Sequence, residues 1–390
     1  MSAVGIIAEF NPMHTGHKRL IDYAHTIGDT VICAISGNFV QRGDVAILSK
    51  QQRAKFALLC GADIVAEMPV IWSMSTAQNF ALCGVWQLYN LGCEKIVFGS
   101  ECGDIAALTN AADILNSDGF FEKVSEKAKS GITFAVAREI VASEMGVDFT
   151  LLRGANNNLG IEYILAAKKL NLPIEFHTIK RIGAGHDSNE IDSGFVSSSF
   201  IRDELFKGNI GYTERFMPRE IRGIIKEDHI ANIKNLETAI LATLRTKTVE
   251  DFENLPDISE GLHNKIFFSV RVATGLDELY NSIKTKRYTL ARIRRLVLSA
   301  FLGLDNQFFM TTPPYVRVLG FSEQGLSHLK TPQGVIPIIT RASQIKELGS
   351  DAQKIFDIEC RATDIYALAF SKALECGSEQ RMKLLKTEEL

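Results

Sequence analysis

Two histidines near the start of the chain, His14 and His17, are separated only by a threonine and a glycine. A short apolar run precedes them and is interrupted by Asn11-Pro12, and a helical pattern begins at Gly16. The N–H groups of a helix's first turn bind anions, and imidazoles placed there can donate hydrogen bonds to phosphate oxygens. This arrangement predicts electrostatic catalysis at a phosphorus atom under attack, without a covalent intermediate. A pair of capping or surface histidines is the alternative.

The run Ser197-Ser-Ser199 is a second candidate phosphate-binding site, because it precedes a predicted helix whose first turn carries Arg202. Hydroxyls, the amides of a helix start and one guanidinium can together surround a polyphosphate. Serines are also favoured helix N-caps, which is the purely structural explanation. Since both motifs occur in one chain, we expect both to bind phosphate, with His14, His17 and Arg202 as the catalytic residues.

These residues must be positioned by the elements around them, and strands and helices alternate over the first 180 residues. We expect strands at residues 3–9, 30–35, 64–67, 95–98 and 174–179, and helices at 16–26, 50–60 and 76–91. This alternation indicates an α/β fold in which a parallel sheet is covered by helices on both faces. Ligands of such sheets bind at the carboxyl ends of the strands, where His14 and His17 are expected.

From about residue 216 the pattern becomes mostly helical, apart from an extended segment at residues 310–319 that contains two prolines. A length of 390 residues suits two domains. We therefore expect a phosphate-binding domain at residues 1–215 and a mostly helical C-terminal domain at residues 216–390.

The net charge of −3 gives no general indication of nucleic-acid binding, but residues 284–295 hold six basic residues and no acidic one. Tyr288 in this segment is suited to stack on a base. The segment predicts RNA contacts from Lys284, Lys286, Arg287, Arg292 and Arg295. A solvated helix face or an interdomain ion-pair network is the alternative.

The seven cysteines include no C-x-x-C pair, which favours reduced thiols in a cytoplasmic protein and gives no metal site. The sequence shows neither a signal peptide nor an apolar run of about 18 residues, so we expect no contact with a membrane. No obligate protein partner is indicated.

The string Phe10-Asn-Pro-x-His14-x-Gly-His17, together with Ser-Ser-Ser-x-Ile-Arg202, resembles the nucleotidylyltransferase superfamily. Further segments, spread over nearly the whole chain, are similar to the family of bacterial tRNA(Met) cytidine acetate ligases. These segments are Ser36-Gly-Asn-Phe-x-Gln-Arg-Gly43, Arg53-Ala-Lys-x-Ala-Leu58, Glu67-Met-Pro69, Phe98-Gly-Ser-Glu101, Asn156-Asn-x-Leu-Gly-Ile161 and Lys180-Arg181-Ile182. One departure is Ala155-Asn-Asn-Asn158, where that family more usually has Pro-Asn-Asn/Asp-Ile.

The resemblance implies a Rossmann-like nucleotidylyltransferase domain that joins ATP and acetate into acetyl-adenylate, with Mg²⁺ accompanying the ATP. The acetyl group then passes to N4 of the wobble cytidine of elongator tRNA(Met). The ATP-binding residues that follow from the resemblance and from the serine motif are Ile7, Ala8, Glu9, Phe10, Asn11, Pro12, Met13, His14, Thr15, Gly16, His17, Lys18, Arg19, Leu20, Gly99, Asn156, Arg181, Ile182, Ser198 and Ser199.

Two other functions fit parts of the sequence. A small-molecule nucleotidylyltransferase would adenylate a phosphorylated metabolite, but it needs little beyond the first domain. A non-catalytic RNA-binding protein would not need both histidines and the serine–arginine motif. Asn38, Gln41, Arg42 and Arg53 shape an acetate pocket, shape the tRNA entry, or hold loops in place. Glu67 is either a substrate contact or a structural residue, and His186 is expected in a mobile surface loop.

Overall fold

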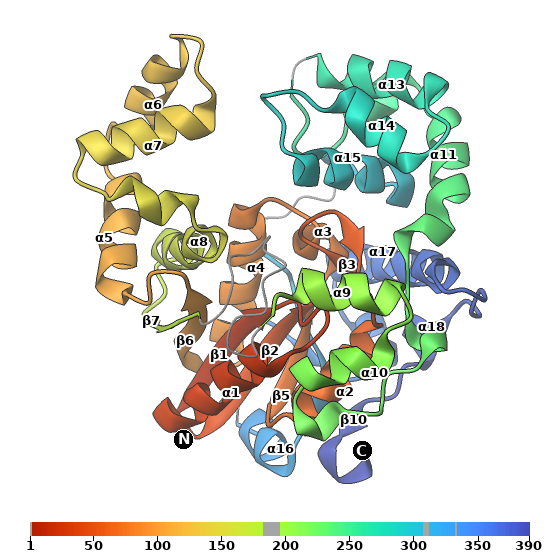
Figure 1. The fold of residues 1–390 in the computed structure, drawn as a ribbon. Helices are drawn as coiled ribbons and strands as arrows, with labels where there is room; N and C mark the ends of the chain where they lie inside the picture. The colour runs from red at the N-terminus through yellow and green to blue at the C-terminus, as the bar shows by residue number, and fades with distance from the viewer. Residues whose placement is uncertain (1, 182–195, 260, 307–311, 332–333) are drawn as a thin grey trace.

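The computed structural model describes residues 2–181, 196–259, 261–306, 312–331 and 334–390. Within these residues an eight-stranded sheet is flanked by helices on both faces (Figure 1). The strand order is β10-β8-β5-β2-β1-β6-β7, and β9 pairs with β8. The strands are β1 (Ala3–Ala8), β2 (Thr30–Ser36), β5 (Ile64–Met68), β6 (Cys93–Ser100), β7 (Glu175–Lys180), β8 (Val316–Phe321), β9 (Ile338–Ile339) and β10 (Leu385–Lys386).

The strands β5, β2, β1, β6 and β7 are parallel, as their apolar sequences and the intervening helices predict. The chain first builds the sheet outward from β1 through β2 to β5, and then returns to place β6 on the other side of β1. Ligands of open α/β sheets bind where the strand order reverses in this way. The loop between β1 and the first helix starts at that point.

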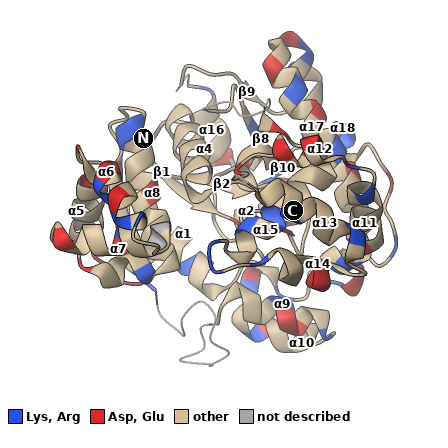
Figure 2. Cartoon of the chain, turned by 90° about the horizontal axis from the view of Figure 1, so that it is seen from above, with Lys and Arg blue, Asp and Glu red and all other residues tan. Residues whose placement is uncertain are grey.

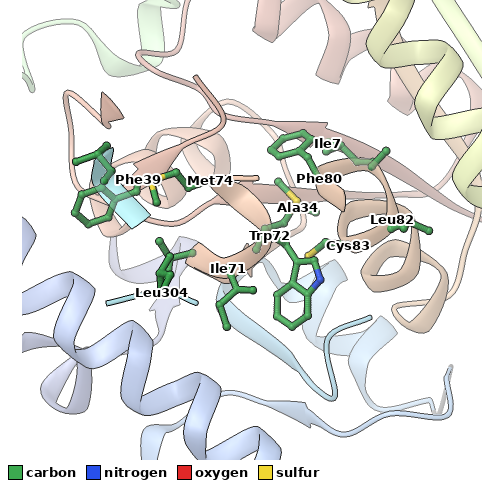
Figure 3. Close-up of a cluster of buried hydrophobic side chains, with 14 of the residues drawn as sticks. Ile7, Ala34, Phe39, Ile71, Trp72, Met74, Phe80, Leu82, Cys83 and Leu304 are labelled. Carbon is green, nitrogen blue, oxygen red and sulfur yellow. The ribbon is translucent and has the colours of Figure 1, made fainter. Parts of the chain in front are cut away.

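Helices cover the two faces of the sheet and bury separate apolar clusters. On one face lie α1 (Thr15–Ile27), α2 (Lys50–Leu59) and α9 (Ser198–Phe206). On the other face lie α4 (Ala77–Asn90) and α8 (Ala155–Lys169), where Ile7 and Ala34 of the strands meet Trp72, Phe80 and Cys83 (Figure 3). The remaining helices before residue 215 are α3 (Val70–Ser73), α5 (Ile105–Leu115), α6 (Phe120–Ala128), α7 (Phe134–Glu144) and α10 (Ile210–Thr213).

After four short 3₁₀ turns, the chain forms a lobe of helices: α11 (Glu237–Arg245), α12 (Val249–Glu253), α13 (Leu262–Val272), α14 (Leu276–Ile283) and α15 (Leu290–Leu302). It then returns to the sheet through β8, α16 (Glu323–Leu329), β9, α17 (Ser350–Tyr366), α18 (Ser378–Arg381) and β10. In the described part of the chain the mostly parallel sheet therefore takes strands from both sides of residue 215.

Strand β8 pairs with β5 in the antiparallel direction, which differs from the purely parallel sheet expected from the sequence. The physical reason is that β5 would otherwise present an unpaired edge, and an apolar strand from the C-terminal segment covers it. One buried apolar cluster accordingly contains residues from Ala3 to Phe370. No helix in the described ranges is long and apolar enough to cross a membrane.

Five buried ionisable side chains fasten the C-terminal elements to the sheet: Lys50, Glu67, Arg317, Glu359 and Glu379. The Lys50 ammonium pairs with Glu67, lies 2.7 Å from Glu379 and lies 3.6 Å from Glu359. Arg317 pairs with Glu379 and lies 3.6 Å from Glu67. Burial raises the pKa of Glu67, but Lys50 and Arg317 outweigh burial and hold it below its usual value. Burial and Glu67 raise the pKa of Glu359 to about 8.

The segment expected as a loop after β2 contains a small hairpin. Its strands β3 (Phe39–Val40) and β4 (Asp44–Val45) are antiparallel, and Gly43 forms the turn with a positive φ of 74°. The hairpin lies at the carboxyl edge of the sheet, next to the end of β1. A hydrogen bond from Gln41 N to Glu9 Oε1, 2.8 Å long, connects the two.

Candidate active site

The first turn of α1 is capped by the two histidines predicted from the sequence. His14 is the N-cap residue, and its Nδ1 accepts a hydrogen bond from Gly16 N at 3.0 Å. The Nδ1 of His17 accepts from His14 N at 3.2 Å. The two rings stack with centroids 3.8 Å apart and an interplanar angle of 23°. A ring nitrogen that accepts a hydrogen bond carries no proton, so each imidazole carries its proton on Nε2.

Both imidazoles are neutral near pH 7. Burial lowers the pKa of His14 to about 3, with a further contribution from Arg181. Burial also lowers the pKa of His17, and His14 and Arg181 lower it further. Capping and ligand binding are thus compatible in one side chain: Nδ1 satisfies the helix start, and Nε2–H is a donor suited to a phosphate oxygen.

The serine–arginine motif lies against the same loop, although it is more than 180 residues away in the sequence. The Nη1 of Arg202 donates to Asn11 O at 2.6 Å, and the Oγ of Ser198 donates to Pro12 O at 3.3 Å. Ser197 caps α9 by accepting from Phe200 N at 3.2 Å. The structure therefore brings together the two phosphate-binding motifs that the sequence predicted.

Arg53 holds the backbone around this loop in place. Its side chain is fully buried, and it donates hydrogen bonds to four backbone carbonyl oxygens. Nη1 donates to Glu9 O at 2.7 Å and to Ser36 O at 2.9 Å, Nε donates to Leu48 O at 2.9 Å, and Nη2 donates to Gly37 O. Of the roles left open for Arg53, these contacts match the one that holds loops in place.

A second group of expected ligand residues lies at the ends of β6 and β7. Arg181 N donates to Ser100 O at 2.9 Å, and a Cβ added at Gly99 would lie 3.3 Å from Arg181 Cγ. Asn156 donates to Glu101 Oε1 from its backbone at 3.0 Å and from its side chain at 2.7 Å. Burial raises the pKa of Glu101, but hydrogen bonds from Asn156, from Asn157 N and from the Glu101 backbone together outweigh burial and lower it. No pattern in the sequence predicts the Glu101–Asn156 pairing.

The other expected ATP residues fall into three groups. Ile7 and Ala8 end β1, residues 9–14 form the loop, and residues 15–20 form the first turns of α1. Within that helix Lys18 pairs with Asp22, and Arg19 Nη1 donates to Lys180 O at 3.3 Å. Ile182 and the expected loop containing His186 lie outside the described residues.

The basic segment divides into an exposed part and a paired part, and Figure 2 shows its basic residues at α15. Lys284, Lys286 and Arg287 are exposed in the connection between α14 and α15. Arg292 and Arg295 instead face Asp257, with nitrogen–oxygen distances of 3.3 Å and 3.5 Å. These ion pairs lie within the helical lobe and are therefore not interdomain, and RNA contact stays a prediction for the segment.

Within the described residues, no group of three or more His, Cys, Asp or Glu side chains is arranged to hold a metal ion.

The fold and the paired histidines define the class: an α/β protein of the nucleotidyl transferase type. Residues 1–381 match the family described as HIGH Nucleotidyl Transferase. The tRNA(Met) cytidine acetate ligase of Thermoanaerobacter sp. (strain X514) is 36% identical, over 99% of this chain and 100% of the relative. The ligase of the same name from Caldanaerobacter subterraneus subsp. tengcongensis is also 36% identical, over 95% of this chain and 96% of the relative.

Among solved structures, the crystal structure of Thermotoga maritima TmcAL bound with alpha-thio ATP matches with a TM-score of 0.89 and 29% identity, covering 99% of this chain and 100% of that chain. Its apo form matches with a TM-score of 0.90. This chain belongs to the HIGH nucleotidyl transferase family and, within it, to the family of the tRNA(Met) cytidine acetate ligases.

Proposed function

We propose that this protein is an ATP-dependent ligase that activates acetate as acetyl-AMP and acetylates N4 of the wobble cytidine of elongator tRNA(Met). The observation that carries the proposal is the pair of stacked imidazoles that cap the start of α1. It occurs in a chain similar over its whole length to ligases of that name. Because its proposed substrate is a tRNA, we propose that the protein acts in the cytoplasm.

In the first step an acetate oxygen forms a bond to the α-phosphorus of ATP, and the bond from that phosphorus to the bridging oxygen breaks. Pyrophosphate leaves with the electron pair. Negative charge grows on the phosphate oxygens. The Nε2–H groups of His14 and His17 can donate hydrogen bonds to these oxygens, and the two rings are already oriented before the reaction. Arg202 supplies a positive charge on the same loop. Neutral imidazoles serve here as hydrogen-bond donors and not as proton carriers.

In the second step the N4 amine of cytidine attacks the acetyl carbon, the bond to the AMP oxygen breaks, and the nitrogen releases one proton to solvent. The amine is a weak nucleophile because its lone pair is delocalised into the ring, and the mixed anhydride compensates by providing a good leaving group. Exposed Lys284, Lys286 and Arg287 are the residues that we assign to the phosphate backbone of the tRNA.

We expect Mg²⁺ only as a companion of the triphosphate. This ion commonly binds substrate phosphates and water and uses few protein ligands. This coordination preference is compatible with the lack of a carboxylate cluster in the part of the chain that the structure describes.

The test is incubation with ATP, radiolabelled acetate and total tRNA, followed by nucleoside analysis. We expect label in N4-acetylcytidine, release of AMP and pyrophosphate, and no transfer when ATP is omitted. Transfer of AMP to a phosphorylated metabolite would instead indicate a small-molecule nucleotidylyltransferase. Binding of tRNA with no turnover would indicate a non-catalytic RNA-binding protein.

A further inference from the structure

Gln41, in the turn of the β3–β4 hairpin, connects three separate elements. Its backbone N donates to Glu9 Oε1 at 2.8 Å, and Glu9 is the first residue of the loop that carries the histidines. Its side-chain Nε2 donates to Ser75 O at 3.4 Å, just before α4. Its carbonyl oxygen accepts from Arg295 Nη1 at 3.2 Å, on α15. Gln41 is therefore hydrogen-bonded both to the histidine loop and to the helical lobe.

Arg295 is fixed from its other side as well. Its Nη2 lies 3.5 Å from Asp257 Oδ2, and its side chain is only 12% exposed. Asp257 also holds Arg292, whose Nη2 donates to Asp257 O at 2.6 Å. A planar guanidinium can bridge two acceptors in this way, whereas an ammonium lacks the fixed fork.

The hairpin and α15 are packed without space between them. A Cβ added at Gly43 would lie 2.5 Å from Arg295 N and 2.7 Å from Arg294 Cβ. Burial raises the pKa of Asp44, while Arg202 and Arg294 both lower it. This carboxylate therefore interacts with Arg202 of the serine–arginine motif and with Arg294 of α15. A shift of α15 must therefore move the hairpin. The hairpin carries Gln41, which is bonded to Glu9, and Asp44, which interacts with Arg202.

We propose that Arg295 is a positioning residue for the nucleotide site and not an RNA ligand. Arg295 lies on the helical lobe, and its hydrogen bond to the carbonyl oxygen of Gln41 fixes the position of the chain at the end of β1. The inference deepens the proposed function and rests on it. It adds that the basic segment has two separate tasks. The exposed residues 284–287 bind RNA, and Arg295 transmits the position of α15 to the ATP loop. Such coupling is reciprocal, so ATP bound at the loop would in turn favour one position of α15.

The test compares Arg295→Lys with Arg287→Ala in two binding experiments that need no turnover. One is calorimetric titration with a nonhydrolysable ATP analogue without RNA, and the other is binding of elongator tRNA(Met) without ATP. We expect Arg295→Lys, which keeps the charge but loses the fork, to weaken analogue affinity about 3- to 10-fold and to leave tRNA affinity nearly unchanged. We expect Arg287→Ala to weaken tRNA affinity and not analogue affinity.

An Asp257→Asn variant supplies an independent check, because it removes the charge opposite Arg295 while the bond to Gln41 can persist. We expect it to weaken analogue affinity less than Arg295→Lys does. Thermal unfolding of each variant verifies that the fold is retained. Unchanged analogue affinity in folded Arg295→Lys, or a loss confined to tRNA affinity, would overturn the inference. Wild-type protein that binds neither ligand would instead contradict the proposed function, and the inference with it.

Discussion

The Nδ1 of His17 accepts the backbone N–H of His14, and the two imidazole rings stack 3.8 Å apart. The helix cap therefore uses one nitrogen of each ring and leaves the proton on the other. The cap also fixes the orientation of the rings before any ligand arrives. Capping and catalysis can be separated by substitutions that keep one role and remove the other.

His14→Asn keeps the cap and removes the donor. Asparagine is among the best N-cap residues, so the free energy of unfolding should change by no more than about 1 kcal/mol. Turnover should fall about 10²- to 10³-fold, the usual cost of losing one donor to developing charge. Urea unfolding and acetylation assays measure the two effects, with His14→Ala as the control that loses both roles. Full turnover in His14→Asn would remove this imidazole from the mechanism.

The same substitution should change how stability depends on pH. A buried His14 with a pKa of about 3 binds no proton between pH 6.5 and pH 3, whereas the unfolded chain does. Stability from this group is thus present above pH 6.5 and is lost as the pH falls. Urea unfolding at pH 7 and pH 5 should show wild type losing about 2 kcal/mol more than His14→Asn. Equal losses would show that His14 is not held neutral.

Lys50→Met should be strongly destabilising. The Lys50 side chain is fully buried between Glu67 and Glu379, so the substitution leaves buried carboxylates without their cation. We expect a loss of about 3–5 kcal/mol in the free energy of unfolding. The control is Lys354→Met, at an exposed lysine whose nearest acidic partner is 4.0 Å away. Similar unfolding curves for the two variants would contradict the role assigned to Lys50.

Glu359→Gln tests whether this carboxyl carries a proton. Its pKa of about 8 lies above that of the unfolded chain, so its contribution to stability is complete below about pH 4.5 and is lost as the pH rises to 8. Between pH 6.5 and pH 8, wild type should therefore lose stability that Glu359→Gln retains, up to about 2 kcal/mol. At pH 4.5 the variant should be close to wild type, and at pH 6 it should already be more stable than wild type by about 2 kcal/mol. A large destabilisation at pH 6 would mean that Glu359 is ionised.

Gly43→Ala tests the contact between the hairpin and α15. A positive φ alone costs a non-glycine residue about 1–2 kcal/mol. Gly208 has a φ of 82° with open space around it, so Gly208→Ala measures that cost alone. At Gly43 the added Cβ also meets Arg295 N at 2.5 Å, so we expect at least about 1 kcal/mol of further destabilisation. Equal unfolding free energies would show that α15 moves away without cost.

Much of the N-terminal half was predictable, because its signals are local. His14, Gly16 and His17 lie within one turn, and Ser197 caps the helix that carries Arg202. The apolar run of β1 is stopped by Asn11-Pro12, which predicts that the histidine motif lies at the carboxyl edge of the sheet. The histidine tautomers were not predictable, since they depend on how Gly16 N and His14 N are oriented.

The C-terminal half was harder to predict, because its decisive contacts are distant in sequence. Nothing near Val316–Phe321 indicates that this strand pairs with β5, and the bond from Arg295 to Gln41 spans 254 residues. The spacing of Arg292 and Arg295 shows a basic helix face but not the Asp257 that lies opposite it. A charge pattern reports which residues are basic, whereas the fold decides which of them face solvent.

The central claim is that Nε2 of His14 and His17 donates to the phosphates of ATP. A crystal structure of this protein with a nonhydrolysable ATP analogue tests it most directly. We predict phosphate oxygens within about 3.2 Å of both Nε2 atoms, with Arg202 beside them. A nucleotide bound elsewhere, with the start of α1 blocked or vacant, would contradict the account.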